Sequence, residues 1–292
     1  MIVFDHHLIF KDEPQFNLRQ SNKVKDILYV KSTNSTPLLS SLSFKTDWLL
    51  MSDKKIRYIS EKPFSSEYKS ILWALEIEES ILLIWDPNRR EILYRELKYY
   101  TAEKLLFWIL HTFLPLVFEI ENKYKILHVG SVEISGKSIL FSASSYGGKS
   151  TLTDYFLKQG HRLIGDDTVA IEKQKDTYNV IASYPYHRPY REMGSLGSFT
   201  DNYSDETRVL QNIYVLKKVG STKTITINEM CGVDKFKALH MSSFIMFDFM
   251  QVERFNFFSE MASLVNVYEI NIPWDLNRLN EVYDAILSHV RL

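Results

Sequence analysis

Several features that this chain lacks narrow what it can be. Its 292 residues include one cysteine, Cys231, so an internal disulfide and the usual cysteine-based zinc sites are excluded. The 35 lysine and arginine residues nearly balance the 36 aspartate and glutamate residues, and the formal net charge is −1. No overall field draws the chain to nucleic acid or to an anionic membrane, so we expect neither as a partner.

Long apolar runs are also absent. The opening residues, MIVFDHHLIFKDE, lack the cationic flank, the apolar stretch and the small-residue cleavage site of a signal peptide. The most apolar segment, Leu105–Phe118, is too short to span a bilayer and is interrupted by His111 and Pro115. Together with the low cysteine content, these features predict a cytoplasmic protein.

Residues 1–100 are predicted to be rich in β-structure, and substrate recognition is the role that we consider for this region. Short apolar or alternating runs between turn-forming residues predict strands at Ile27–Val30, Trp48–Leu50, Lys55–Ile59, Ile81–Trp85 and Glu91–Arg95. The last two flank Asp86-Pro87-Asn88, a turn-forming cluster, and are predicted to form a hairpin.

After residue 100 the pattern changes. Thr101 is a suitable N-cap for an apolar helix that is predicted to end or kink around Pro115. A βαβ arrangement follows, in which a loop and a helix connect strands. Its predicted parts are strands at Ile126–Val129 and Ser138–Ser142, a helix at Thr151–Gln159 ended by Gly160, and strands at Leu163-Ile164 and Thr168–Ile171.

The C-terminal residues predict one more strand and one more helix. The strand is Asn266–Ile272, and a helix begins at about Asp275, after Pro273. Apolar residues recur at helical spacing and predict a packed core face. They are Leu276, Leu279, Val282, Tyr283, Ile286, Leu287 and Val290.

The segment Ala143–Ser150, ASSYGGKS, fits the Walker A pattern of phosphate-binding loops. Gly147 and Gly148 permit a tight turn that points successive N–H groups at a phosphate. Lys149 would face the β and γ phosphates of a nucleotide, and the Ser150 hydroxyl would ligate Mg²⁺. The motif lies between a predicted strand and a predicted helix, so we predict ATP and Mg²⁺ as cofactors. The predicted nucleotide-binding residues are Ser144, Ser145, Tyr146, Gly147, Gly148, Lys149, Ser150 and Thr151.

Other motifs separate the classes of P-loop protein. A motor ATPase needs an acidic pair on a later strand, but Phe249 follows Phe244–Asp248 where the second acid would stand. The base-recognition motif of GTPases and the LSGGQ-like signature of transporters are absent. The chain offers Asp166-Asp167 instead, at the end of the strand after the loop helix. One carboxylate there could accept a proton from an attacking hydroxyl and the other could hold Mg²⁺, provided that the strand ends or bends at the pair.

The run from His128 to Glu172 resembles the core of HPr kinase/phosphorylase and its relatives, which share a fold with ATP-type phosphoenolpyruvate carboxykinase. That family has a histidine before the P-loop, then G-K-S/T, then G-H-x-L-x-x-D-D. Here these elements are His128, Gly148-Lys149-Ser150 and the segment Gly160–Asp167. The composite is far more specific than a Walker A pattern alone.

The resemblance implies roles for the matching residues. Asp166 would be the general base toward a serine hydroxyl, and Asp167 would support the metal. Lys149 and Ser150 would contact the phosphates and Mg²⁺. His128 would lie in the site, steadying a phosphate or the base.

The resemblance extends to the following loop. Glu192–Gly197, EMGSLG, falls where the HPr enzymes carry a metal-binding glutamate, which makes Glu192 a further candidate metal ligand. The preceding Tyr184–Arg191, YPYHRPYR, looks like the Pro/Arg loop of divergent relatives, some of which phosphorylate lasso peptides. Arg188 or Arg191 would offset charge in the transition state. The C-terminal arginine segment of the HPr enzymes is not found, so the divergent relatives are the better match.

We therefore expect an α/β protein with a β-rich region at 1–100 and a P-loop domain of the HPr-kinase/carboxykinase type at 101–292. The leading hypothesis is a kinase that phosphorylates a Ser or Thr hydroxyl of a peptide or small protein. A kinase for a small-molecule hydroxyl, such as a sugar or amino acid, and a non-catalytic nucleotide-binding regulator are the alternatives. His161 is expected to be structural. The HPr enzymes form hexamers, which leaves a homo-oligomer open.

Overall fold

The computed structural model describes residues 1–17, 26–51, 54–67, 70–189 and 194–290, and they divide into two compact units. The first unit contains the described residues up to Tyr124 together with 194–196. The second begins at Lys125 and contains the remainder. Residues 101–124 therefore pack with the first unit, whereas the sequence placed the division at residue 100.

The first unit is built on a mixed sheet. Among its described residues, nine strands pair in the order β1-β2-β3-β9-β8-β7-β6-β4, with β5 also paired to β6. Strands β8 and β9 form the predicted antiparallel hairpin. The bounds are β1 (Ile2–Val3), β2 (His6–Phe10), β3 (Asp26–Ser32), β4 (Phe44–Lys45), β5 (Leu49–Met51), β6 (Lys54–Ser60), β7 (Trp73–Ile77), β8 (Ile81–Asp86) and β9 (Glu91–Glu96), with η1 at Pro14–Phe16 and α1 at Thr36–Ser41.

A buried helical segment completes the first unit. The Thr101 side chain caps α2 (Ala102–Trp108) by accepting from Lys104 N, as predicted. A π-helical turn, η2 (Ile109–Phe113), leads into α3 (Leu114–Ile120). The helical segment does not end at Pro115. Regular α-helix is instead interrupted by the π turn, which ends two residues before this proline, a residue that has no N–H to donate.

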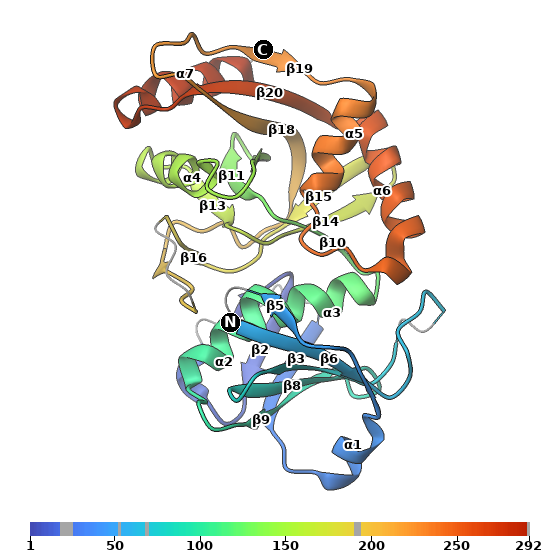
Figure 1. Cartoon of the computed structure of the whole chain (residues 1–292). Helices are drawn as coiled ribbons and strands as arrows, with labels where there is room; N and C mark the ends of the chain where they lie inside the picture. Colours follow the sequence, from blue (N-terminus) through green and yellow to red (C-terminus); the bar gives the residue numbers. More distant parts are fainter. Residues whose placement is uncertain (18–25, 52–53, 68–69, 190–193, 291–292) are drawn as a thin grey trace. The chain divides into compact units, whose positions relative to one another are not determined.

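The second unit has a sheet in which parallel and antiparallel strands mix (Figure 1). The order is β10-β14-β15-β18-β12-β11-β13, and β20 pairs with β18 and β19. Strands β12, β18 and β20 run parallel to one another. The bounds are β10 (Lys125–Leu127), β11 (Gly130–Ile134), β12 (Lys137–Ser142), β13 (Arg162–Gly165), β14 (Val169–Gln174), β15 (Thr177–Ile181), β18 (Arg208–Val219), β19 (Ile227–Glu229) and β20 (Asn266–Pro273), with a separate pair β16 (Tyr186–His187) and β17 (Ser198–Phe199).

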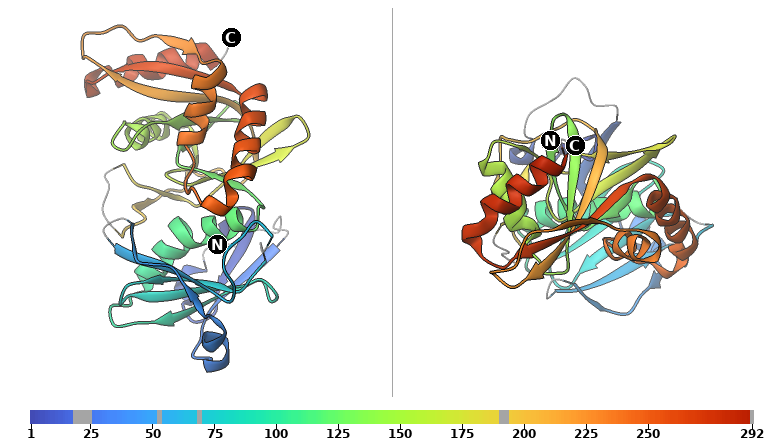
Figure 2. Two further views of the ribbon diagram at one scale, coloured as in Figure 1. Left: turned by 45° about the vertical axis from the view of Figure 1, so that its right-hand side comes forward. Right: turned by 90° about the horizontal axis from the view of Figure 1, so that it is seen from above.

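Helices cover both faces of this second sheet, which makes the unit an α/β structure. Figures 1 and 2 show α4 (Lys149–Lys158) and α7 (Leu279–Val290) on one side, and α5 (Gly232–Met241) and α6 (Gln251–Leu264) on the other. Side chains alternate along β12 accordingly. Phe141 packs in the cluster with α4 and α7, and Leu140 packs in the cluster with α5 and α6.

The predicted βαβ arrangement is present with one strand added. Strands β12 and β13 flank α4, but β11 lies between them and is antiparallel to both. The C-terminal prediction is confirmed for Val282, Ile286 and Val290, which are buried. It is wrong for Leu276, which is 73% exposed because α7 begins only at Leu279, after the short 3-10 turn η4 (Leu276–Arg278).

None of the helices in the described part of the chain is long and apolar enough to cross a membrane.

Candidate functional site

The loop between β12 and α4 carries the Walker A pattern and has the backbone that such a loop requires. Gly148 stands at the N-cap of α4 with φ of 93°, and Tyr146 also has a positive φ, 59°. A side chain at Gly147 would lie 2.5 Å from Ala143 Cβ, so only glycine fits there. Left-handed residues in a loop that opens a helix are typical of anion-binding backbone.

The two polar side chains that end the motif point to different partners. Lys149 is buried, and its Nζ donates to the Ala143 carbonyl at 3.0 Å, so the ammonium folds back across the loop. Ser150 Oγ donates to Asp166 Oδ1 at 3.2 Å. The first turn of α4 is therefore tied directly to the predicted acidic pair.

The condition that the strand end or bend at the acidic pair is met. Strand β13 ends at Gly165, and Asp167 adopts a left-handed backbone with φ of 69°. Asp167 is thereby released from strict strand alternation, and its side chain forms an ion pair with Arg188. A non-glycine residue in this conformation costs of order 1 kcal/mol, which the surrounding contacts must offset.

Asp166 is the more enclosed member of the pair, with 3% of its surface exposed. Besides Ser150, it accepts from His187 Nδ1 at 3.0 Å and from the Arg188 backbone N–H at 3.1 Å. His187 is also buried, and its Nε2 lies 3.5 Å from Asp154 Oδ1 on α4. No local motif indicated His187, which stands alone among aromatic and arginine residues in the sequence and ends the short strand β16.

His128 follows the end of β10 and lies at the site. Its Nδ1 donates to the Asp167 carbonyl at 2.9 Å, and its backbone N–H donates to Ser242 O at 2.7 Å. Both bonds fix the ring beside the acidic pair. His161, by contrast, bonds Tyr283 OH at 3.0 Å through Nε2 and packs against Phe156, which fits the expected structural role.

A cavity of about 420 Å³ opens above the loop and brings most of the predicted residues together. It is lined by His128, Ser145, Tyr146, Gly147, Gly148, Lys149, Ser150, Thr151, Asp167, Arg188, Pro189 and Trp274. Two predicted residues, Asp166 and Ser144, are not in this lining. Asp166 accepts a hydrogen bond from the lining residue Ser150, and the Ser144 carbonyl accepts from Gly147 N at 2.9 Å within the loop. Trp274, which no sequence motif indicates, also lines the cavity.

Two further predicted residues, Arg191 and Glu192, lie outside the described residues. Within the described ones, no group of three or more His, Cys, Asp and Glu side chains is placed to hold a metal ion. The predicted Mg²⁺ set is of another kind, because it combines a hydroxyl and carboxylates with phosphate oxygens from the nucleotide.

Close packing behind the site requires a glycine at position 130. A Cβ built on Gly130, the first residue of β11, would lie 2.3 Å from Thr153 Oγ1 on α4 and 3.9 Å from Asp166 Oδ1. Helix α4 thus packs closely against the backbone of β11 beside Asp166.

Comparison with known proteins adds a distant structural likeness. No protein-family profile matches the chain, and no curated protein matches it in sequence. Among solved structures, the HPr(Ser) kinase/phosphatase from Coxiella burnetii is similar, with 13% identity and a TM-score of 0.35. That match covers 56% of this chain and 95% of the other. At this TM-score the likeness carries no weight for function.

Proposed function

We propose that this chain is an ATP- and Mg²⁺-dependent kinase, with a Ser or Thr hydroxyl of a peptide or small protein as acceptor. The observation that carries the proposal is that polar side chains from separate elements meet beside a loop with the Walker A pattern. Lys149 and Ser150 meet His128, Asp167 and Arg188 around one cavity, although these residues come from separate elements. A cation, a hydroxyl, a carboxylate and a guanidinium in one cavity are the groups that phosphoryl transfer uses.

In the proposed reaction the acceptor oxygen attacks the γ-phosphorus and the bond to the β–γ bridging oxygen breaks, which releases ADP. The hydroxyl proton passes to a carboxylate. Lys149 and Arg188 offset the negative charge on the transferring group and on the leaving oxygen. Catalysis of this kind is mostly positioning and charge neutralisation, and the tethered side chains described above supply both.

The contacts favour a division of roles within the acidic pair. Asp166 and Ser150 present a carboxylate and a hydroxyl 3.2 Å apart, oxygen donors of the hard type that Mg²⁺ takes together with phosphate oxygens. Asp167 lines the cavity. We infer that Asp166 lies on the metal side and that Asp167 faces the acceptor, the reverse of the roles that the resemblance implied. When bound, Mg²⁺ would neutralise charge on the β and γ oxygens.

The experiment is incubation with Mg²⁺ and γ-labelled ATP, with and without candidate peptides and a cell lysate. Lys149→Ala and Asp167→Asn variants run beside an Asp284→Asn control, which changes a carboxylate on α7. Label on an acceptor hydroxyl in the parent and the control, lost in both site variants, supports the kinase. Label that moves only to small molecules favours the small-molecule alternative. ATP binding without transfer to any acceptor overturns the kinase and leaves the nucleotide-binding regulator.

A further inference from the structure

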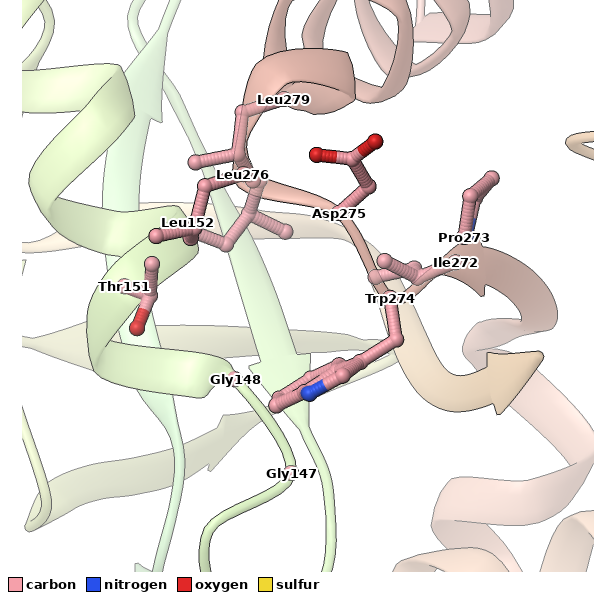
Figure 3. A pocket seen from close by; sticks show the side chains of 10 residues that line it. All are labelled: Gly147, Gly148, Thr151, Leu152, Ile272, Pro273, Trp274, Asp275, Leu276 and Leu279. Carbon is pink, nitrogen blue, oxygen red and sulfur yellow. The ribbon is translucent and has the colours of Figure 1, made fainter. Parts of the chain in front are cut away.

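A second cavity of about 210 Å³ adjoins the first in the same unit. The two share Gly147, Gly148, Thr151 and Trp274 in their linings. The remaining lining comes from Leu152, from the last two residues of β20, Ile272 and Pro273, and from Asp275, Leu276 and Leu279 after it. Figure 3 shows the Trp274 ring extending toward Gly148, with Leu152, Leu276 and Leu279 across from it.

The chemistry of the two cavities differs. The first contains the cationic, carboxylate and hydroxyl groups described above. The lining of the second is apolar side chains and glycine backbone except for Thr151 and Asp275. A nucleotide has the same division, with a charged phosphate end and a flat, weakly polar base. The smaller cavity is below the size of a typical whole-ligand pocket and well above that of a single water, so it suits one ring system.

The position of the second cavity follows from the sheet. The candidate phosphate loop leaves the carboxyl end of β12, and the Trp274 segment leaves the carboxyl end of β20. Both strands run parallel to β18, which lies between them, so the two segments emerge at the same edge. Ligands of α/β sheets bind at this edge.

Two large apolar side chains of this cavity are exposed, although the unit has ample core. Trp274 is 53% exposed and Leu276 is 73% exposed. The Trp274 ring approaches to 3.4 Å of the position that a Cβ on Gly148 would take. Lys218 Nζ, which is outside the lining, lies 3.5 Å from the ring centroid and holds the indole in place. Asp275 Oδ1 accepts from Asn277 N at 3.0 Å and fixes the turn that presents Leu276.

We propose that this cavity binds the purine base of the nucleotide, stacked against Trp274, while the phosphates occupy the adjoining cavity. The inference rests on the proposed function, since it requires a nucleotide at the Ala143–Ser150 loop. It assigns to Trp274 and Leu276 a binding role that no sequence motif indicates. Base–aromatic stacking is strong enough to measure when the ring is removed.

Calorimetric titration with Mg²⁺-ATP and with Mg²⁺-tripolyphosphate, which has the phosphates without the base, tests this. Trp274→Ala should weaken ATP binding on the order of tenfold and leave tripolyphosphate binding unchanged. Trp274→Phe should retain most of the ATP affinity. Lys149→Ala should weaken both ligands. Phe255→Ala, which removes a similarly exposed aromatic ring from α6, should change neither.

The failures of the two proposals are distinguishable. If the parent binds ATP but Trp274→Ala changes its affinity less than twofold, the base site is wrong and the nucleotide site stands. The same conclusion follows if tripolyphosphate binds the parent as tightly as ATP. If the parent binds neither ligand, both proposals fall. Should Trp274→Ala misfold, the exposed Leu276→Ser is measured instead and must show the same selective loss of ATP affinity.

Discussion

At the residue scale, the roles that we propose for the acidic pair differ from those that the resemblance implies, and variants can decide between them. Asp166→Asn is expected to raise the Mg²⁺ concentration needed for ATP binding, because it weakens the donor beside Ser150. Asp167→Asn is expected to retain Mg²⁺-ATP binding and to lower turnover by a factor of roughly 10² to 10⁴, the usual contribution of a general base. Mg²⁺ titrations of ATP affinity, paired with turnover assays, measure both effects. The opposite pattern would restore the roles implied by the resemblance.

His187 has a testable role as a positioning residue. Its ring holds the buried Asp166 carboxylate at 3.0 Å. His187→Leu should lower the free energy of unfolding by about 1–3 kcal/mol, since it leaves a buried acceptor with one partner fewer, and should also reduce turnover. His289→Leu is the matched control. The Nδ1 atom of His289 lies 2.8 Å from Tyr214 OH, and neither residue lines the site. Urea denaturation should show a loss in both variants, whereas turnover should fall only in His187→Leu. Equal turnover in the two would contradict the role.

The residues of the site were predictable to the extent that local motifs carried them. Local motifs marked Lys149, Ser150 and Asp167, and all three line one cavity, while their roles stay predictions. His187 and Trp274 could not be found in this way. His187 is brought to Asp166 by the short strand β16, and Trp274 is brought to Gly148 by the parallel register of β20.

At the scale of elements, the close approach of α4 to β11 predicts a rescue. Gly130→Ala should lower the free energy of unfolding by about 1–3 kcal/mol, because the new Cβ meets Thr153 Oγ1 at 2.3 Å. Thr153→Ala removes that oxygen, which is buried without a hydrogen-bond partner, and leaves an ordinary 3.6 Å contact with Cβ. The double variant should therefore recover most of the loss in urea denaturation. A Gly130→Ala protein as stable as the parent would refute the close contact.

The helices and strands were largely predictable where apolar periodicity coincides with residues that end a helix or a strand. The helix after the Walker A pattern ends at Lys158 and is followed by Gly160 with φ of 93°. Strand β11 was missed because Gly130 and Ser131 give it little apolar signal. An end or a kink was predicted near Pro115. The helical segment does not end there, and a π turn, which leaves no local signature, interrupts the regular α-helix before the proline.

At the scale of the whole molecule, the division into two units was harder to place. Residues 101–124 follow a β-rich region and precede a βαβ pattern, and nothing local says which side they join. Their apolar rings decide it, since Phe113 packs on Trp73 at 4.9 Å between ring centroids. A packing preference of this kind depends on the shape of the completed sheet, and sequence periodicity does not contain it.

The first unit should also respond to pH through His6. Burial, reinforced by the positive charge of Lys123, lowers the pKa of His6 from 6.5 to about 4. The folded protein therefore holds His6 neutral where the unfolded chain binds a proton. Stability should be full above pH 6.5 and should fall toward pH 4, by up to about 3 kcal/mol from this group. His6→Phe should flatten the dependence of unfolding free energy on pH across this window. If His6→Phe leaves the slope of unfolding free energy against pH unchanged, His6 is not the source of this pH dependence.

The left-handed backbone at Asp167 has a consequence for inheritance. Asparagine and glycine are the residues that best tolerate this conformation, and each is one nucleotide substitution away from an aspartate codon. A single point mutation can thus remove the carboxylate that faces the cavity while the fold survives. If the proposed kinase activity is correct, gene copies that bind nucleotide without transferring phosphate are within one mutational step of this sequence, so a catalytic lineage and a silent one can diverge with no loss of the protein itself.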